Sequence, residues 1–298
     1  MEEFKSGFVT IIGRTNVGKS SIINKIVGEK VSAVANKSQT TRKNIRAIVN
    51  RENSQIIFID TPGIHKPKSK LSQVMVESAY ISIPEVDVVV YVVEATSKRI
   101  DEPTLNKIRE ANKSTILVIN KIDLVDAKEV AEQIEAYKDL YDFKAILPMS
   151  VKDNKNVNEL IEEIERNLKV GPAYYDVEEY TDQTMREMAE EIIREKALKL
   201  LRDEVPHGIY VVVSKMKSRK TKTGERIFDV DATIFCLRNS HKGIIIGKNG
   251  SMLKRIGTYA REDLERMFDS KINLQLWVKV DEDWINNSKI VNKFKSKD

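Results

Sequence analysis

Residues 13–20 read Gly-Arg-Thr-Asn-Val-Gly-Lys-Ser and fit the pattern G-x-x-x-x-G-K-[ST]. An apolar run at 8–12 precedes the motif and a helical pattern at 20–27 follows it, which is the strand–loop–helix context that the pattern requires. In that context the glycines let backbone N–H groups turn inward around phosphate oxygens, and the helix N-terminus adds the positive end of its dipole. A chance glycine-rich turn is the alternative, and the two flanks argue against it. The sequence therefore predicts a nucleotide-phosphate site at the end of a buried strand.

Two residues of this loop have clear chemical roles. Lys19 can neutralise charge on the β- and γ-phosphates, which makes it a candidate catalytic residue, and Ser20 can ligate Mg²⁺. The candidate nucleotide contacts of the loop are Gly13, Arg14, Thr15, Asn16, Val17, Gly18, Lys19, Ser20 and Ser21.

Apolar runs alternate with helical patterns through the first half of the chain. The further runs lie at 56–59, 86–93, 115–119 and 145–147. They are rich in Val and Ile and lack polar alternation, which is typical of central strands in a parallel sheet. Helical patterns at 127–140 and 158–168 fall between or after them. We therefore expect a doubly wound α/β domain with a mostly parallel sheet over residues 1–170.

The pattern changes after residue 170. Gly171-Pro172 opens a segment without a clear period, so we interpret 171–180 as a linker and 181–298 as a second domain. The second domain shows the order α-β-β-α-α-β. Its expected elements are a helix at about 184–203 with a capping box at Thr184 and Glu187, strands at 209–216 and 226–237 joined by a basic turn at 217–224, a short helical stretch, a helix at 251–268 and a strand at 272–280.

Asp60-Thr61-Pro62-Gly63 follows the apolar run at 56–59. An acid at the C-terminal end of a strand can hold Mg²⁺ through water, and a following glycine can present its N–H to the γ-phosphate. Alone the four residues would be a common turn, but about 40 residues after a phosphate loop they are typical of an NTPase switch. Asp60, Thr61, Pro62 and Gly63 are therefore candidate nucleotide contacts, and Gly63 is a candidate catalytic residue.

Asn120-Lys121-Ile122-Asp123 again follows an apolar run. The Asp123 carboxylate can accept hydrogen bonds from the N1–H and the amino group of guanine. Adenine lacks both donors and would leave a buried carboxylate unpaired, so this motif selects GTP over ATP. Asn120 can bond the N7 edge of the purine, and Lys121 can lie along the ring. Backbone N–H groups of Ser150, Val151 and Lys152 complete the expected base pocket.

A loop at 36–43 has no apolar periodicity and contains two adjacent threonines. A hydroxyl in this loop could ligate Mg²⁺ only when a γ-phosphate is present. We prefer Thr41 for this role, which also makes it a candidate catalytic residue, and place Thr40 second. The expected metal ligands are Ser20, Thr41 and Asp60.

The sequence Ile-Ile-Ile-Gly-Lys-Asn-Gly-Ser at 244–251 places a G-x-x-G turn between two helical stretches. In the KH fold such a turn lets the backbone pack against about four nucleotides of single-stranded nucleic acid. A tight helix–helix turn is the alternative, but the α-β-β-α-α-β order fits a type II KH domain. The candidate RNA contacts are Lys242, Ile246, Gly247, Lys248, Asn249, Gly250, Ser251, Lys254 and Arg255.

The net charge of +5 is unevenly distributed. Residues 1–180 hold 26 basic and 27 acidic residues, whereas 181–298 hold 24 basic and 18 acidic residues. The stretch 211–255 has 11 basic residues and 3 acidic ones. This bias indicates a polyanionic partner for the second domain, although charge alone leaves a solvated surface equally open.

Over its whole length the chain resembles the Era family of GTPases, which belongs to the TRAFAC class. The resemblance rests on the motifs at 13–20, 60–63 and 120–123, on Gln-Thr-Thr-Arg at 39–42, and on Leu-Gln-Leu-Trp-Val-Lys-Val at 274–280. It implies binding of GTP and GDP with Mg²⁺, slow hydrolysis, and a role in maturation of the small ribosomal subunit through the 3′ end of 16S ribosomal RNA. An RNA-binding assembly factor whose nucleotide is structural is the competing hypothesis.

Two positions bear on hydrolysis. Ile64 stands where Ras-like proteins place a glutamine that orients water, and an isoleucine cannot hydrogen-bond water. Asn16 matches the asparagine with which potassium-dependent GTPases help to hold K⁺, and a cation there could stabilise transition-state charge as an arginine finger does. We therefore hypothesise that K⁺ stimulates hydrolysis and that Asn16 is a candidate catalytic residue; loop geometry alone is the alternative role for Asn16.

The remaining features bound the setting of the protein. The single cysteine, Cys236, excludes a disulfide framework, and we expect it to be buried in a strand. The absence of a long apolar run and of a signal-peptide profile predicts a cytoplasmic protein, with peripheral association at the inner face of the membrane left open for the basic turn. No obligate oligomer is expected. Trp277 and Trp284 are interpreted as core or capping aromatics rather than base-stacking platforms.

Overall fold

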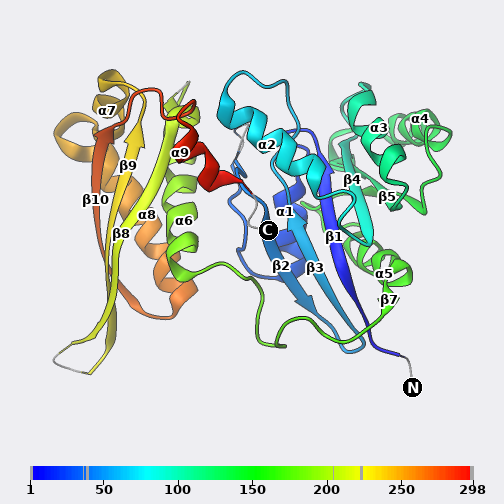
Figure 1. Ribbon diagram of the computed structural model, residues 1–298, viewed down its shortest axis with the longest axis horizontal. Helices are drawn as coiled ribbons and strands as arrows, with labels where there is room; N and C mark the ends of the chain where they lie inside the picture. Colours follow the sequence, from blue (N-terminus) through cyan, green and yellow to red (C-terminus); the bar gives the residue numbers. More distant parts are fainter. Residues whose placement is uncertain (1–2, 36, 38–39, 204, 222–223, 296–298) are drawn as a thin grey trace. The chain divides into compact units, whose positions relative to one another are not determined.

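The computed structural model describes residues 3–35, 37, 40–203, 205–221 and 224–295 (Figure 1). The chain divides into two compact units. The first comprises 1–32, 41–182 and 294–298, and the second comprises 33–40 and 183–293. Each unit has its own hydrophobic core and is described by itself.

The first unit is built on one sheet with the strand order β2-β3-β1-β4-β5-β6. Its strands are β1 (Lys5–Gly13), β2 (Ile45–Asn50), β3 (Ser54–Asp60), β4 (Val88–Glu94), β5 (Ser114–Asn120), β6 (Ala145–Met149) and β7 (Lys169–Val170). All neighbours are parallel except β2, which pairs antiparallel with β3, and the short β7, which pairs antiparallel with β1. The expected doubly wound, mostly parallel sheet is confirmed, and the edge strand β2 is an addition that the apolar runs did not reveal.

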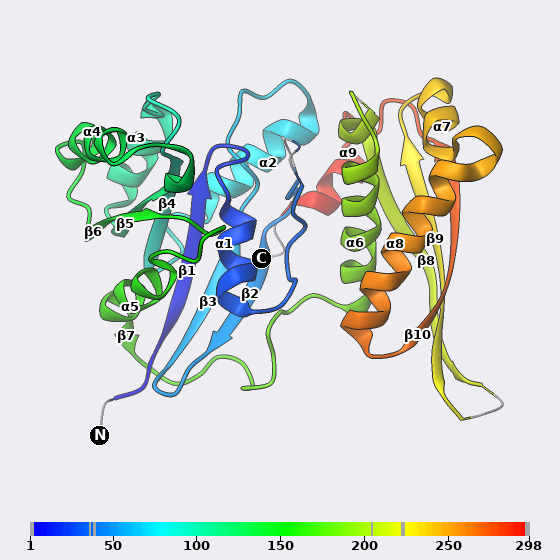
Figure 2. The same ribbon diagram turned by 180° about the vertical axis from the view of Figure 1, so that it is seen from behind.

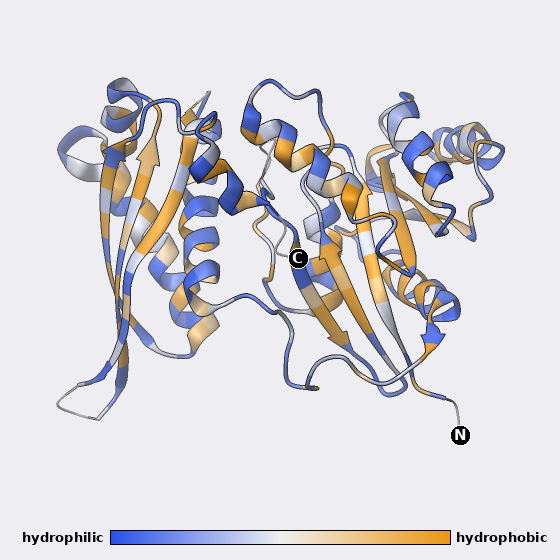
Figure 3. Cartoon of the chain, in the orientation of Figure 1, coloured by the Kyte–Doolittle hydropathy of each residue, from blue (hydrophilic) through white to orange (hydrophobic). Residues whose placement is uncertain are grey.

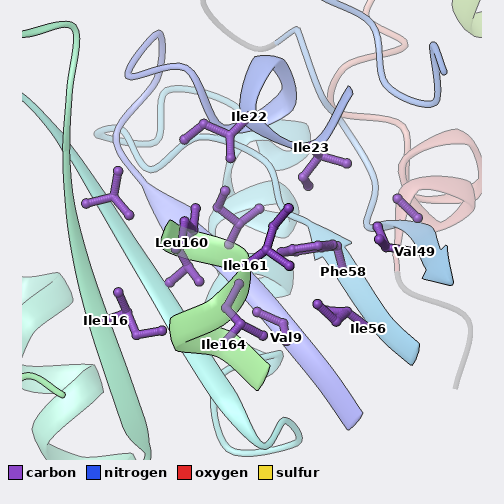
Figure 4. Close-up of a cluster of buried hydrophobic side chains, with 14 of the residues drawn as sticks. Val9, Ile22, Ile23, Val49, Ile56, Phe58, Ile116, Leu160, Ile161 and Ile164 are labelled. Atoms are coloured by element: carbon purple, nitrogen blue, oxygen red, sulfur yellow. The ribbon is translucent and has the colours of Figure 1, made fainter. Parts of the chain in front are cut away.

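Helices cover both faces of this sheet (Figures 1 and 2). They are α1 (Lys19–Val27), α2 (Lys70–Ile81), α3 (Glu102–Ala111), α4 (Ala127–Lys138) and α5 (Val157–Asn167). One core lies between the sheet and α1 and α5, where Ile22, Leu160 and Ile164 pack on Val9 (Figure 4). The opposite core packs α2, α3 and α4 on the alternate residues of the same strands. Because both faces are covered, the strands are apolar without alternation.

The segment predicted as a linker is fastened along the edge of this sheet. Gln55 Oε1 accepts hydrogen bonds from the N–H groups of Tyr174 and Tyr175 at 2.7 and 3.0 Å. Farther along, the N–H of Ile48 donates to the carbonyl of Tyr180 at 2.9 Å. Residues 171–182 consequently belong to the first compact unit.

The second unit is a three-stranded sheet with helices on one face (Figures 1 and 2). Its elements are α6 (Met185–Leu200), β8 (Ile209–Lys220), β9 (Arg226–Cys236), α7 (Asn239–Ile246), α8 (Ser251–Phe268), β10 (Lys271–Val280) and the short α9 (Ser288–Val291). The strand order is β10-β9-β8, with β9 and β8 antiparallel and β10 and β9 parallel. This confirms the α-β-β-α-α-β order. The strand β8 runs on to Lys220, so half of the predicted basic turn is strand.

Local sequence signals explain several ends of these helices. The predicted capping box is present at the start of α6, where Thr184 Oγ1 accepts from the N–H of Glu187 and the Glu187 carboxylate accepts from the N–H of Thr184. Helix α1, in contrast, begins at Gly18 with no side-chain cap among the described residues. Its first N–H groups are therefore not used by a side chain, as expected for a helix that binds an anion.

The two tryptophans differ. Trp284 is fully buried, its Nε1 donates to the carbonyl of Gly208 at 3.0 Å, and its ring lies 4.7 Å from that of Tyr210. Trp277 is 44% exposed. The expectation of a core or capping aromatic is confirmed for Trp284 and wrong for Trp277, because the alternation of β10 turns that side chain away from the core. Cys236 is buried as expected.

No helix in the described ranges combines the length and the apolar character needed to cross a membrane. Figure 3 shows instead that apolar residues concentrate on the strands and on the helix stripes that face them, while the outer helix surfaces are hydrophilic.

Candidate nucleotide and RNA sites

The carboxyl ends of three strands in the sheet supply the nucleotide motifs. The loop 13–18 follows β1, Asp60 ends β3, and Asn120 ends β5. Parallel strands in this order bring these ends to one edge of the sheet, where ligands bind in doubly wound folds. The tertiary structure thus gathers motifs that are up to about 100 residues apart in the chain.

The phosphate loop depends on left-handed backbone at two positions. Gly18 has φ 104°, and a Cβ there would lie 2.3 Å from Asn120 Nδ2. Asn16 has φ 65°, a conformation that asparagine tolerates better than most residues. Val17 is instead a core residue, and Asn120 Nδ2 donates to its carbonyl at 2.8 Å. Asn120 therefore braces the phosphate loop.

Lys19 is buried inside the loop. Its Nζ donates to the carbonyls of Gly13 at 3.1 Å and Arg14 at 3.0 Å. Burial lowers the pKa of Lys19 to about 8, and the nearby charge of Asp60 opposes this shift only in part. Phosphate oxygens carry full charge and are better acceptors for an ammonium group than carbonyls are. The environment of Lys19 therefore favours an anionic ligand.

Three oxygens converge at the expected metal position. Ser20 Oγ donates to Asp60 Oδ2 at 2.7 Å, and Thr41 Oγ1 lies 3.0 Å from Ser20 Oγ and 3.3 Å from Asp60 Oδ2. The other carboxylate oxygen of Asp60, Oδ1, is buried and makes no hydrogen bond to a described residue. Burial raises the pKa of Asp60, against the hydrogen bond from Ser20 and the charge of Lys19. A compact group of oxygen donors with an unused buried carboxylate oxygen fits Mg²⁺.

The two adjacent threonines have different surroundings. Thr41 is 5% exposed and its hydroxyl belongs to the oxygen cluster just described. The Thr40 hydroxyl donates to the carbonyls of Lys37 at 2.7 Å and Ala35 at 3.3 Å. The geometry therefore favours Thr41 over Thr40 as the metal ligand. Residues 36, 38 and 39 of the same loop lie outside the described residues.

Backbone hydrogen bonds join the end of the switch motif at 60–63 to the phosphate loop. The N–H of Ile64 donates to the carbonyl of Gly13 at 3.0 Å, and the N–H of Thr15 donates to the carbonyl of Ile64 at 3.3 Å. A Cβ at Gly63 would lie 2.7 Å from the Cα of Thr15. The Ile64 side chain is buried in the core, and the Thr61 hydroxyl donates to the carbonyl of Ile11 at 2.7 Å. Thr61 thus supports the sheet through its side chain.

The base motif is organised around Asp123. Ser150 Oγ donates to Asp123 Oδ1 at 2.8 Å, and Lys152 Nζ lies 3.7 Å from Oδ2. The Ser150 hydrogen bond is the main cause that lowers the pKa of Asp123, which keeps the carboxylate a charged acceptor. The N–H of Ser150 donates to the carbonyl of Lys155 at 3.3 Å. Ser150 therefore acts here through its hydroxyl rather than through the expected N–H.

Sequence reasoning missed one partner of this site. Glu94 ends β4 and its carboxylate lies 2.6 Å from Lys121 Nζ. This ion pair orients Lys121, which has a left-handed backbone with φ 64°. An acid at the end of an apolar strand was the available signal, since the same pattern had singled out Asp60.

The G-x-x-G turn joins α7 to α8 through three residues with positive φ: Gly247 at 72°, Asn249 at 52° and Gly250 at 76°. A Cβ at Gly247 would lie 2.8 Å from the Cβ of Met252, so only glycine fits there. Lys248, Asn249, Ser251, Lys254 and Arg255 are exposed around the turn, and Lys242 is half-buried on α7. The side chain of Ile246 packs against the core, so it supports the turn from below.

Each unit of the chain matches a known family model. A family model described as a 50S ribosome-binding GTPase matches residues 8–121, and a KH domain model matches 204–285. The fold and the sites define a P-loop GTPase unit followed by a KH unit.

Curated relatives share this two-unit organisation over nearly the full length. GTPase Era of Caldanaerobacter subterraneus is 49% identical over 97% of both chains, and GTPase Era of Clostridioides difficile is 48% identical over 98% of both. A crystal structure of Era in complex with MgGDPNP and nucleotides 1506–1542 of 16S ribosomal RNA has a TM-score of 0.92 at 39% identity and 98% coverage of both chains. A variant of Aquifex aeolicus Era bound to GDP·AlF₄⁻ has a TM-score of 0.91 at 38% identity.

The chain belongs to the Era family of GTPases. It is a GTP-hydrolysing enzyme that uses GTP and GDP with Mg²⁺, and its second unit is an RNA-binding KH domain.

Proposed function

We propose that this chain is a slow GTP-dependent switch that binds single-stranded RNA at the 3′ end of 16S ribosomal RNA and assists maturation of the small ribosomal subunit. The observation that carries the proposal is the oxygen cluster of Ser20, Thr41 and Asp60 beside the phosphate loop, in a chain whose other unit presents a G-x-x-G turn. The RNA class is supported by the solved Era complex, which contains nucleotides 1506–1542 of that RNA.

Several residues of the first unit have separate roles in phosphoryl transfer. Lys19 neutralises charge on the transferred phosphoryl group, and the N–H of Gly63 donates to it. Ser20, Thr41 and Asp60 would hold Mg²⁺, which would neutralise negative charge on the phosphates. Asp123, oriented by Ser150, selects guanine.

The buried side chain of Ile64 explains a slow intrinsic rate. A residue at this position that could orient water would lower the barrier, whereas Ile64 is 7% exposed and packs in the core. We propose that K⁺ held near Asn16 supplies part of the missing charge stabilisation. Hydrolysis should be faster in K⁺ than in Na⁺, and Asn16→Gly, which keeps the left-handed backbone but removes the amide, should abolish the difference. Equal rates in the two salts for the parent protein would refute this role.

The loop before Thr41 offers a route from the nucleotide to the RNA-binding unit. Residues 33–40 group with the second compact unit. Within that unit Arg194 on α6 donates from Nη2 to the carbonyl of Thr40, and the N–H of Val34 donates to the carboxylate of Glu195 at 3.4 Å. Arg194 and Glu195 are both buried. Because Thr41 follows directly in the chain, a γ-phosphate that orders Thr41 also restrains this segment.

Two measurements test the proposed function together. Phosphate release from GTP should rise when RNA nucleotides 1506–1542 are added, and crosslinking to that RNA should be stronger with GDPNP than with GDP. Lys248→Asp with Asn249→Asp should remove crosslinking and leave basal hydrolysis unchanged, because both residues are remote from the phosphate loop in sequence and lie in the other unit. Absence of phosphate release with and without RNA would favour the structural-nucleotide alternative.

We also propose that the protein is cytoplasmic and functions without an obligate oligomer, and that any membrane association is peripheral through the basic residues of β8. Cell fractionation in low and high salt tests this, since electrostatic attachment to anionic lipid is lost as salt rises.

A further inference from the structure

The sheet of the second unit has one face without helices. Along β10, Leu274, Leu276 and Val278 point into the core beneath the helices. The alternate residues therefore point to the opposite face, because successive side chains in a strand alternate. In the described ranges no helix of the unit covers the middle of that face, which Figure 1 shows toward the viewer and Figure 2 shows behind α6 and α8.

Trp277 lies on this helix-free face, on the edge strand β10. It is 44% exposed, and its indole N–H makes no hydrogen bond to a described residue. Its cross-strand neighbour on β9 is Thr233, which in turn pairs with Val212 on β8. The neighbours are small enough to leave the ring accessible from the outside. An exposed aromatic on an open sheet is the arrangement with which RNA-binding sheets stack bases.

The same face carries an excess of positive charge. Its basic residues are Lys215, Lys217, Arg219, Lys271 and Lys279, and its acidic residues are Asp229, Asp231 and, just after β10, Asp281, which accepts a hydrogen bond from the Tyr210 hydroxyl. Asp229 is paired with Arg219 at 2.8 Å, and Asp231 lies 3.8 Å from Lys215. In the described part of the chain, Lys217 and Lys279 make no ion pair. Lys279 lies two residues from Trp277 on β10, and Lys217 lies farther along the same face on β8.

We propose that this helix-free face is a second RNA-binding surface, on which Trp277 stacks against a base while Lys217 and Lys279 contact phosphates. The strand that carries Trp277, β10, is the edge strand of the sheet and also packs against α7 and α8, which hold the G-x-x-G turn. An RNA held at that turn can pass over this edge onto the helix-free face. The inference rests on the proposed function, because it takes the same RNA as ligand.

The chain offers a direct reporter for this surface. It has two tryptophans, of which Trp284 is fully buried and Trp277 is half exposed. Quenching of tryptophan fluorescence by acrylamide therefore reports mainly on Trp277. We expect RNA nucleotides 1506–1542, added to the GDPNP-bound protein, to shield Trp277 from acrylamide. Trp277→Phe should lose this response, because only the buried tryptophan remains.

Binding measurements with variants test the stacking. Trp277→Ala should weaken binding of the same RNA by about 5- to 100-fold, the range expected when one base–aromatic stack is removed. Trp277→Phe should recover much of the affinity. Tyr174→Ala, which removes a somewhat more exposed aromatic (55%) from the first unit, should have no effect. Lys217→Gln with Lys279→Gln should make the salt dependence of binding shallower, by about 0.7 in the logarithmic slope for each phosphate that is no longer neutralised.

The outcomes separate this inference from the proposed function. If Lys248→Asp with Asn249→Asp abolishes RNA binding while Trp277→Ala binds normally and Trp277 stays open to acrylamide, the second surface is refuted and the proposed function stands. If the parent protein does not bind the RNA at all, both fail. Shielding of Trp277 by the assembled small subunit but not by RNA alone would also overturn the inference, because it would identify a protein as the occupant of this face.

Discussion

Replacing Gly63 by alanine tests whether backbone contacts hold the switch motif at 60–63 against the phosphate loop. The added methyl group would lie 2.7 Å from the Cα and Cγ2 of Thr15 and 2.9 Å from its N atom. These atoms are mostly backbone and cannot rotate away, so one of the two segments must shift. Ile64 joins the two segments: its N–H donates to the carbonyl of Gly13 at 3.0 Å, and its carbonyl accepts from the N–H of Thr15 at 3.3 Å.

The expected magnitude follows from these contacts. Overpacking of this kind costs about 1–3 kcal/mol, so Gly63→Ala should lower the free energy of unfolding by about that amount. The shift also moves the N–H of residue 63 away from the γ-phosphate. A hydrogen bond to a charged group contributes about 1.5–3 kcal/mol, which corresponds to roughly a 10- to 150-fold loss in affinity. GDP lacks that phosphate, so its affinity should change far less.

The assay is a pair of titrations with GDPNP and GDP, combined with denaturant unfolding of the nucleotide-free protein. Gly243→Ala is the matched control, because a Cβ there meets no atom within 4 Å and the residue is helical. That control should be neutral or slightly stabilising. An unchanged GDPNP-to-GDP affinity ratio together with unchanged stability in Gly63→Ala would refute the reasoning.

Three further predictions concern single side chains. Asp123→Asn should weaken GTP binding by at least about 100-fold, because the amide presents donors to the donor edge of guanine; an unchanged Kd would remove Asp123 from the base pocket. Burial lowers the pKa of Lys19 to about 8, and a bound phosphate should raise it again. GDP binding at pH 8.5 should therefore take up protons, which calorimetry in two buffers detects, and this uptake should disappear near pH 6.5. Proton uptake that does not vary with pH would contradict this. Trp284→Ala should cost about 3–5 kcal/mol of stability in denaturant unfolding, whereas Trp277→Ala should cost far less, and equal costs would contradict the assigned burial.

The strands of the first unit were predictable because their physical signal is local. β4 and β5 are covered on both faces, so nearly every residue is apolar and the runs stand out. The strand β2 escaped because it is a short edge strand whose apolar residues are interrupted by Arg46 and end at Asn50. The segment 171–182 escaped for a related reason: its hydrogen bonds to Gln55 and several of those to β2 use its backbone atoms, which leave no pattern in the side chains.

In the candidate nucleotide site, too, some residues had a local sequence signal and others did not. Contiguous motifs identified the residue types, since phosphate loops and base motifs need particular side chains at fixed spacing. The side chains that pair with these motif residues were harder to predict from the sequence. Glu94 pairs with Lys121 across two neighbouring strands, and the Ser150 hydroxyl reaches Asp123 from the next one. Such contacts depend on strand register, and a single sequence does not state the register between distant segments.

By itself the sequence indicated the chemistry of this protein: a phosphate loop with Lys19, an acid at Asp60, an Asp123 expected to select guanine and a G-x-x-G turn at 247–250. These features are local, because each depends on a few consecutive residues and the backbone angles they permit. Only the tertiary structure showed that the Thr41 hydroxyl, and not that of Thr40, lies beside Ser20 and Asp60, and that one tryptophan is buried while the other is exposed. Those outcomes depend on which faces of distant segments meet, and long-range packing settles that.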